Sequence, residues 1–192
     1  MIYAAIDHIA SELNQYIKRT FSLSEDMVVI SNLLDQDGTV SMHANNKLVL
    51  FLVNIEKDVT AQQKTRFSGS ASTRAAMTTV PLYLNLYLMV AGNFSGSHYA
   101  EGLKFVSAAT SFFQRHPVLD QHNTPALDKR IEKLVLDIEN MSLNDLSSLW
   151  GVLSGRYLPS VLYKVRMVTF DAGDIQYQAS VLKKPSVAVG KN

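Results

Sequence analysis

The segment from Leu149 to Val168 constrains the fold of this 192-residue chain more than any other segment does. Its first residues end an amphipathic helix, and Gly155 is a residue type that commonly terminates helices. After Pro159 the residues alternate between two sets, one of them apolar, which is the pattern of a β-strand with one buried face. A helix that leads into such a strand indicates an α+β domain, and the length of the chain fits one domain.

Four other segments have strand patterns: 27–30, 47–56, 81–90 and 130–140. Segment 47–56 is apolar on both faces, so we expect helices or a neighbouring subunit to cover both sides. Segment 81–90 alternates leucine with tyrosine and asparagine, which predicts a leucine core face and a half-polar face beneath a helix or at a subunit contact. Segment 130–140 predicts a strand with one solvated face and with Leu134, Leu136 and Ile138 inside.

Three segments predict helices. Residues 3–19 and 99–114 carry apolar residues at intervals of three and four, and Ser97 is a candidate N-cap for the second helix. Ser142 and Asp145 have the spacing of a capping box, which predicts a third helix through Leu153 with its leucines and Trp150 inward. The predicted fold is therefore a single α+β domain in which about three helices flank a mostly antiparallel mixed sheet.

The segment 58–80 is polar and contains the positive charges of Lys64, Arg66 and Arg74. Two interpretations are open for it: a mobile, solvated insertion, or a loop that faces a partner and orders on assembly. The pattern weakens near the C-terminus, so we assign residues 1–170 to the domain and 171–192 to a C-terminal extension. Within the extension, residues 175–182 are a candidate strand for a neighbour's sheet.

Charge and composition argue against several functions. The chain has 18 basic and 17 acidic residues, without the basic excess that non-specific nucleic-acid binding usually needs. No apolar run approaches the ~20 residues needed to cross a bilayer, and the N-terminus does not resemble a signal peptide. The chain has no cysteine, and its five histidines stand in no metal-ligand pattern. The sequence therefore predicts no metal, no cofactor and no enzyme.

Several short motifs together resemble a known family. They are Pro81-Leu82-Tyr83-Leu84-Asn85-Leu86-Tyr87, Val106-Ser107-Ala108, Phe112-Phe113-Gln114, His116-Pro117-Val118-Leu119, Ser142-Leu143-Asn144-Asp145-Leu146, Leu149-Trp150, Gly155-Arg156-Tyr157, Pro159-Ser160 and Tyr163-Lys164-Val165-Arg166. In this order and spacing they resemble the tail-terminator or tube-cap proteins of phage-tail-like contractile injection systems, a family first catalogued as a domain of unknown function. The resemblance covers about residues 2–170.

The resemblance implies a tail-terminator-like fold that assembles as a homo-hexameric ring. Such a ring sits on the last layer of the inner tube, stops its growth and engages the end of the sheath. The implied partners are thus the inner tube protein and the sheath protein, with no nucleic acid and no direct membrane insertion. The resemblance implies no catalytic residue. It places the protein in the bacterial cytoplasm during assembly and then in a contractile particle, either extracellular or membrane-anchored.

The candidate interface residues combine exposed charges with aromatic side chains. They are Tyr83, Asn85, Tyr87, Arg156, Tyr157, Lys164 and Arg166, together with Lys64, Arg66 and Arg74. The alternative for Tyr83 and Tyr87 is ordinary core beneath a helix. For Lys164 and Arg166 it is a solvated strand face or cross-strand pairing with Asp137 or Glu139. The alternative for the whole protein is a standalone regulatory module that binds a peptide or protein at an exposed sheet edge.

Overall fold

The computed structural model describes residues 1–34, 38–39, 41–59, 83–153 and 156–169. The predicted C-terminal extension lies outside these residues, and so does the predicted loop apart from Asp58 and Val59. Lys64, Arg66 and Arg74 are therefore not placed, and neither is Gly155 as the end of the third helix.

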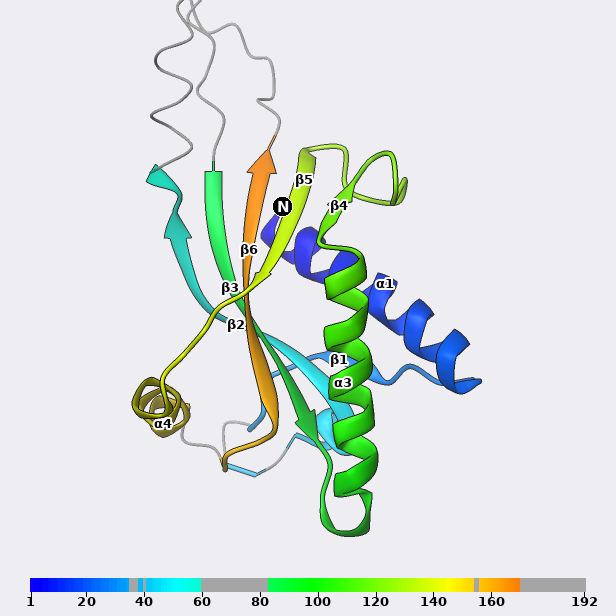
Figure 1. Ribbon diagram of the computed structural model, residues 1–192, viewed down its shortest axis with the longest axis vertical. Coiled ribbons are helices and arrows are strands. Elements are labelled where there is room, and N and C mark those ends of the chain that lie inside the picture. The colour runs from blue at the N-terminus through cyan, green and yellow to red at the C-terminus, as the bar shows by residue number, and fades with distance from the viewer. Residues whose placement is uncertain (35–37, 40, 60–82, 154–155, 170–192) are drawn as a thin grey trace, which may run out of the picture.

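One sheet of six strands organises the described residues (Figure 1). The strands are β1 (Val28–Ile30), β2 (Lys47–Lys57), β3 (Tyr83–Asn93), β4 (Val118–Asp120), β5 (Ile131–Ile138) and β6 (Ser160–Thr169). Their order across the sheet is β1-β2-β3-β6-β5-β4, and every neighbouring pair is antiparallel except β1 with β2. This mixed, mostly antiparallel sheet confirms the predicted fold class.

The described residues form three α-helices, which lie on the two faces of the sheet (Figure 1). They are α1 (Ile2–Phe21), α3 (Tyr99–Arg115) and α4 (Leu143–Val152), and two short 3-10 helices, η1 (Met42–Ala44) and η2 (Gly96–His98), precede β2 and α3. Helices α1 and α3 cover one face together, whereas α4 lies on the opposite side and near one end of the strands. The described helices include none that is long and apolar enough to cross a membrane.

The main core lies between the sheet and the pair α1 and α3. Leu86, Leu88 and Val90 of β3 are buried in it, together with Ile9 of α1 and Phe105 of α3. The intervening residues of β3 point to the other face, so the predicted alternation of this strand is confirmed. The strand continues to Asn93, three residues beyond the end that the sequence pattern predicts.

A second, smaller core lies beneath α4. Trp150 is buried there against the opposite side of the sheet, where Phe51, Met89 and Leu162 are also buried. The predicted capping box begins the helix: the Asp145 amide donates to the Ser142 hydroxyl at 3.2 Å, and the Ser142 amide donates to the Asp145 carboxylate at 3.3 Å. Leu146, Leu149 and Leu153 pack against this cluster, as the sequence pattern predicts.

Two local predictions are wrong. Ser97 does not cap α3, because His98 is the N-cap residue, Ser97 lies inside η2, and no side chain accepts a bond from the first turn. Ile138 is 49% exposed rather than inside. Ile138 pairs with Tyr163 of β6 on one side, but β4 pairs only with residues 133–135 of β5, so no described strand pairs with the end of β5 on its outer side.

Segment 47–56 agrees with its prediction only in its first half. Residues 48–51 of β2 are buried on both faces, but residues 54–57 are exposed in the single chain. Helices thus cover the first half, and a neighbouring subunit remains the predicted cover for the second. The short strand β4 had no clear sequence signal, because it has only three residues and follows Pro117 directly.

Candidate subunit interface

None of the described helices covers the part of one sheet face that lies beyond α4. In Figure 1, α4 lies beside the lower end of the sheet, and β2, β3, β6 and β5 continue upward beyond it. The strand register places Tyr87 opposite Lys164, and Asn85 opposite Arg166. The side chains on this part of the sheet form what we call the polar sheet face. It consists of Asn54, Glu56, Tyr83, Asn85, Tyr87, Asp137, Lys164 and Arg166. The structure thus brings together five of the predicted interface residues.

Tyr87 is the centre of one group of contacts on this face. Its hydroxyl donates to Glu56 Oε2 at 2.9 Å, and the ammonium of Lys164 lies 5.8 Å from the centre of its ring. Loss of hydration raises the pKa of Tyr87, and the hydrogen bond to Glu56 raises it further. Tyr87 is half-buried and also packs against the smaller core cluster that contains Trp150, so ordinary packing stays an alternative account of this residue.

Arg166 has a partner within the chain. Its Nη2 lies 3.3 Å from Asp137 Oδ2 on β5, which is the cross-strand pairing considered from the sequence. The two side chains are 49% and 61% exposed, so this ion pair contributes at most about 1 kcal/mol to stability. Both side chains remain accessible to a second molecule.

Asn85 is buried between these charged groups, with 7% of its surface exposed. Its Oδ1 accepts no hydrogen bond from the described residues, although Glu56 and Arg166 flank it in the register. A buried amide oxygen without a donor costs about 1–3 kcal/mol.

Arg156 and Tyr157 form a separate patch. Both are exposed in the segment between α4 and β6, and the Tyr157 ring meets the Trp150 ring edge-on at a centroid distance of 5.8 Å. Nine positions separate Tyr157 from Arg166 in the chain, and at ~3.3 Å per strand residue the two lie on the order of 20–30 Å apart. The structure therefore divides the predicted interface residues into two patches at opposite ends of β6.

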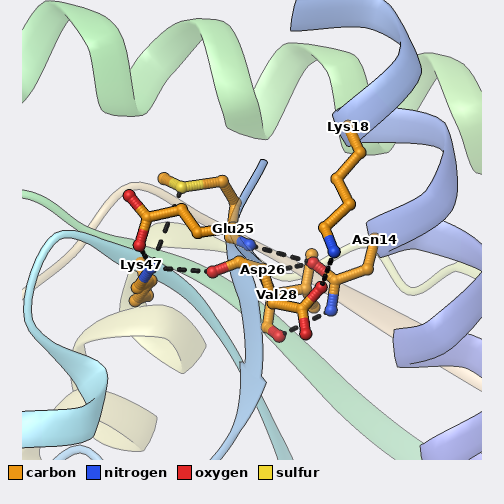
Figure 2. Close-up of polar contacts among 7 residues, drawn as sticks. Asn14, Lys18, Glu25, Asp26, Val28 and Lys47 are labelled. Atoms are coloured by element: carbon orange, nitrogen blue, oxygen red, sulfur yellow. Dashed lines mark hydrogen bonds and ion pairs between the residues drawn. The ribbon is translucent and has the colours of Figure 1, made fainter. Parts of the chain in front are cut away.

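Sequence reasoning did not find the asparagine that occupies the outer edge of β1. Figure 2 shows Asn14 of α1 beside Val28. Its Nδ2 donates to the Val28 carbonyl at 2.8 Å, and its Oδ1 accepts from the amides of Met27 and Val28 at 3.0 and 2.8 Å. Lys18 and Lys47 bind the preceding loop through Asp26 and Glu25 at 2.7 and 3.0 Å.

A second asparagine occupies the outer edge of β4, at the other end of the sheet. Asn123 Nδ2 donates to the Val118 carbonyl at 2.7 Å, and its Oδ1 accepts from the Asp120 amide at 2.9 Å. Thr124 binds the Asp120 carbonyl through its own amide at 2.9 Å. Unpaired edge groups invite non-specific strand pairing, and in this protein side chains occupy them at both terminal strands.

The described residues hold no cluster of three or more metal-ligating side chains. His8 is buried, and loss of hydration lowers its pKa, so it is neutral near pH 7. The polar sheet face combines a hydrogen bond of Tyr87 to Glu56 with the ion pair of Arg166 and Asp137.

The model of the Pvc16 N-terminal domain family matches residues 4–184, which is nearly the whole chain. The chain belongs to this family. Comparison of this Pvc16 N-terminal domain protein with curated protein sequences finds no significant match.

Two solved structures are similar to this Pvc16 N-terminal domain protein. One is the sheath/tube terminator of an extracellular contractile injection system, PVC, in its extended state, with a TM-score of 0.64, 16% identity and coverage of 100% of this chain. The other is the tube-terminating cap of the anti-feeding prophage, with a TM-score of 0.47, 14% identity and 93% coverage. The chain spans 64% and 61% of the lengths of these two proteins. The first comparison shows that this chain has the fold of a tail terminator.

Proposed function

We propose that this protein is a structural cap that terminates the inner tube of a contractile injection system. The observation that carries the proposal is the combination of membership in the Pvc16 N-terminal domain family with a terminator fold over the whole chain. A cap acts through shape: one face of it resembles the next tube layer, and the other face offers nothing on which the tube can extend. Such a role needs no catalytic residue.

The cap is a ring of six copies joined by a heterologous, head-to-tail contact. In this contact one surface of each copy binds a different surface of the next. The polar sheet face and the patch of Arg156 and Tyr157 are two such surfaces, because they lie at opposite ends of β6 and expose charged and aromatic groups. Lys64, Arg66 and Arg74 are proposed to add to the interface from the segment that follows β2.

The ring binds the last layer of tube protein and the end of the sheath. The similar structure that shares this fold over the whole chain is named as a terminator of both the sheath and the tube, which supports both partners. Assembly takes place in the bacterial cytoplasm, and the cap then remains in the contractile particle. Neither nucleic-acid binding nor direct membrane insertion belongs to this role.

Two measurements on the purified protein test the proposal. Size-exclusion chromatography with light scattering is expected to give six times the 21.3 kDa of one chain, either for the protein alone or after addition of tube protein. Electron microscopy is expected to show that tube protein polymerises to shorter tubes, closed at one end, than it does alone. A strict monomer that leaves tube length unchanged would support the peptide-binding regulatory module instead.

A further inference from the structure

Among the described residues, no strand pairs with the outer edge of the second half of β2. β1 pairs with β2 only at Leu48, Val49 and Leu50, and β2 then continues to Lys57. No other described strand lies on the outer side of β2 past Leu50. We call residues 52–57 on this side the free edge of β2.

The backbone groups on this edge can be assigned from the register. The Asp58 amide donates to the Tyr83 carbonyl, so Asp58 points toward β3. Alternate residues of an antiparallel strand point in opposite directions, so Ile55 and Lys57 direct their amides and carbonyls away from β3. Leu52 does the same before the bulge, because Leu48 and Leu50 bond outward to the β1 segment. The free edge thus offers backbone donors and acceptors for an added strand.

β4, the terminal strand on the opposite side of the sheet, cannot pair with the free edge of β2. Asn123 already occupies the outward groups of Val118 and Asp120 on β4. Two copies therefore cannot join β4 of one sheet to β2 of the next without breaking those bonds. A strand that pairs with the free edge of β2 must therefore come from a segment other than β4.

An apolar groove lies beside the start of the free edge. Ile30, Leu33, Leu34, Leu52, Val152 and Leu153 contribute to its lining. Val152 is 82% exposed and Ile30 is 39% exposed, so part of this apolar lining faces solvent. A strand that pairs with β2 here would place alternate side chains toward this groove, which favours a segment with apolar residues at every second position.

Residues 175–182 have this pattern, with Ile175, Tyr177, Ala179 and Val181 alternating with polar residues and Leu182. The family match extends to residue 184, so it includes this segment with the domain. The segment follows β6, which is parallel to β2 because both are antiparallel to β3. If it runs antiparallel to β2, Asp174 lies near Lys57 at the end of the free edge, and the two charges attract.

We propose that residues 175–182 of one copy pair, as an added antiparallel strand, with the free edge of β2 in the neighbouring copy. This inference rests on the proposed ring, since each copy then supplies one donor segment and one acceptor edge in a head-to-tail contact. Within one chain, the residues 170–174 would have to pass the ends of β3 and β2 and cover three strand spacings, or about 14 Å. Five fully extended residues reach only about 17 Å, so this path leaves little slack for crossing two strand ends. In an exchange between copies, the segment need not cross its own sheet.

Cysteine cross-linking tests the assignment, because the chain has no cysteine of its own. Ile55→Cys places a thiol on the free edge, where the side chain is 43% exposed, and Ala179→Cys places one in the donor segment. The two single variants are co-expressed with different tags and treated with a short bis-maleimide. Residues within two register positions on adjacent strands lie roughly 5–8 Å apart, so a register error does not prevent the reaction. We expect a covalent dimer that carries both tags.

His122→Cys is the matched control for Ile55→Cys, because it places an exposed thiol beside the occupied edge of β4. Co-expressed with Ala179→Cys, it is expected to give no mixed dimer. A double variant that carries both Ile55→Cys and Ala179→Cys tests pairing within one chain. If the cross-link forms only within single chains, the segment pairs with its own sheet, and the exchange between copies is wrong. The absence of any cross-link at Ile55→Cys would overturn the pairing itself.

The two proposals fail in distinguishable ways. If the unmodified chain caps tubes but no mixed dimer forms, the cap function stands and the strand exchange is wrong. If the mixed dimer forms but tube length is unaffected, the exchange stands and the cap function is wrong.

Discussion

The side chain of Asn14 hydrogen-bonds to both backbone groups of Val28, each at 2.8 Å (Figure 2). A third bond, from the amide of Met27, reaches the same Oδ1 at 3.0 Å. One helix side chain thus takes the place of the strand that would otherwise pair with β1. Because β1 has only three residues, these bonds help to hold it in place beside β2.

Asn14→Ala is expected to lower the free energy of unfolding by about 2–3 kcal/mol, because three partly buried backbone groups lose their partner and each such bond contributes about 1 kcal/mol. Urea denaturation measures the change as a shift of the midpoint. Gln15→Ala, an exposed change on the same helix, is the control and is expected to stay within about 0.5 kcal/mol of the parent. Equal stability of the two variants would contradict the role assigned to Asn14.

Two helical glycines give opposite predictions for the same substitution. A methyl group at Gly102 would lie 2.7 Å from Cδ2 of Phe94, whereas one at Gly151 meets nothing within 4 Å. Gly102→Ala is therefore expected to lose about 1–2 kcal/mol, since overpacking exceeds the gain in helix propensity. Gly151→Ala is expected to gain up to about 1 kcal/mol. Thermal unfolding of both variants checks the difference in sign, and a gain at Gly102 would contradict the packing of α3 on Phe94.

The capping box of α4 leads to a prediction that fluorescence can test, because Trp150 is the only tryptophan in the chain. Ser142→Ala removes the acceptor for the Asp145 amide and is expected to cost about 1 kcal/mol. The loss acts on α4, a helix of ten residues that buries Trp150, so fluorescence of Trp150 should shift to the red before the rest of the sheet unfolds. Asn144→Ala, which leaves the cap bonds in place, is the control. Coincident transitions by fluorescence and circular dichroism would show that α4 does not open separately.

Local patterns in the sequence were enough to predict most elements of this fold. The alternation in β3 and β6 and the capping box of α4 depend on residues close together in the chain, and each is confirmed. β4 was not predicted, because three residues carry too little pattern. The exposure of Ile138 was not predicted either, because it depends on how far a strand elsewhere in the chain extends.

The candidate site could be predicted only in part. The spacing of Tyr83, Asn85 and Tyr87 showed that they share a face, but only the pairing of β3 with β6 brings Lys164 and Arg166 beside them. The separation of Tyr157 from that face likewise depends on the direction of β6. The bond between Asn14 and Val28 joins residues 14 positions apart and has no local signature. Whether these surfaces contact a partner remains a prediction.

His8 predicts a dependence of stability on pH. Burial lowers its pKa below the usual 6.5, and Glu12 and Asp7 oppose this only in part. Below pH 6.5 the unfolded chain therefore binds a proton that the folded chain does not, so stability is complete above that pH and falls as the pH decreases toward the lowered pKa. Asp120 and Asp128 also have lowered pKa values, but their contributions are lost only below about pH 3.8.

The measurement is urea denaturation at about pH 7.5 and about pH 5, on either side of the usual histidine pKa. His8→Met keeps an adaptable apolar side chain at the site and is expected to reduce the difference in stability between the two pH values. His43→Gln, at an exposed histidine, is expected to leave that difference unchanged. If His8→Met has the same pH dependence as the parent, another group causes it.

The ion pair of Arg166 with Asp137 makes a direct test of the polar sheet face possible. Arg166→Glu is expected to give tubes of uncontrolled length if Arg166 contacts a neighbouring copy, but it also places two negative charges together within the chain. The exchange of both residues, Asp137→Arg with Arg166→Glu, restores an internal pair. Lys104→Glu reverses a charge on α3, across the sheet from this face, and is the control expected to leave tube length normal.

Tube length in electron micrographs separates the possible roles of these charges. If Arg166 contacts a neighbour, the exchanged variant remains defective, because the ring still lacks its positive charge at that position. If the exchanged variant caps tubes normally, Arg166 acts only through Asp137, and its assignment to the interface is wrong. Arg156→Glu tests the second patch in the same assay, and normal tube length there would remove Arg156 from the interface. The exposed pair contributes at most about 1 kcal/mol, so its loss alone is too small to unfold the variants at Arg166.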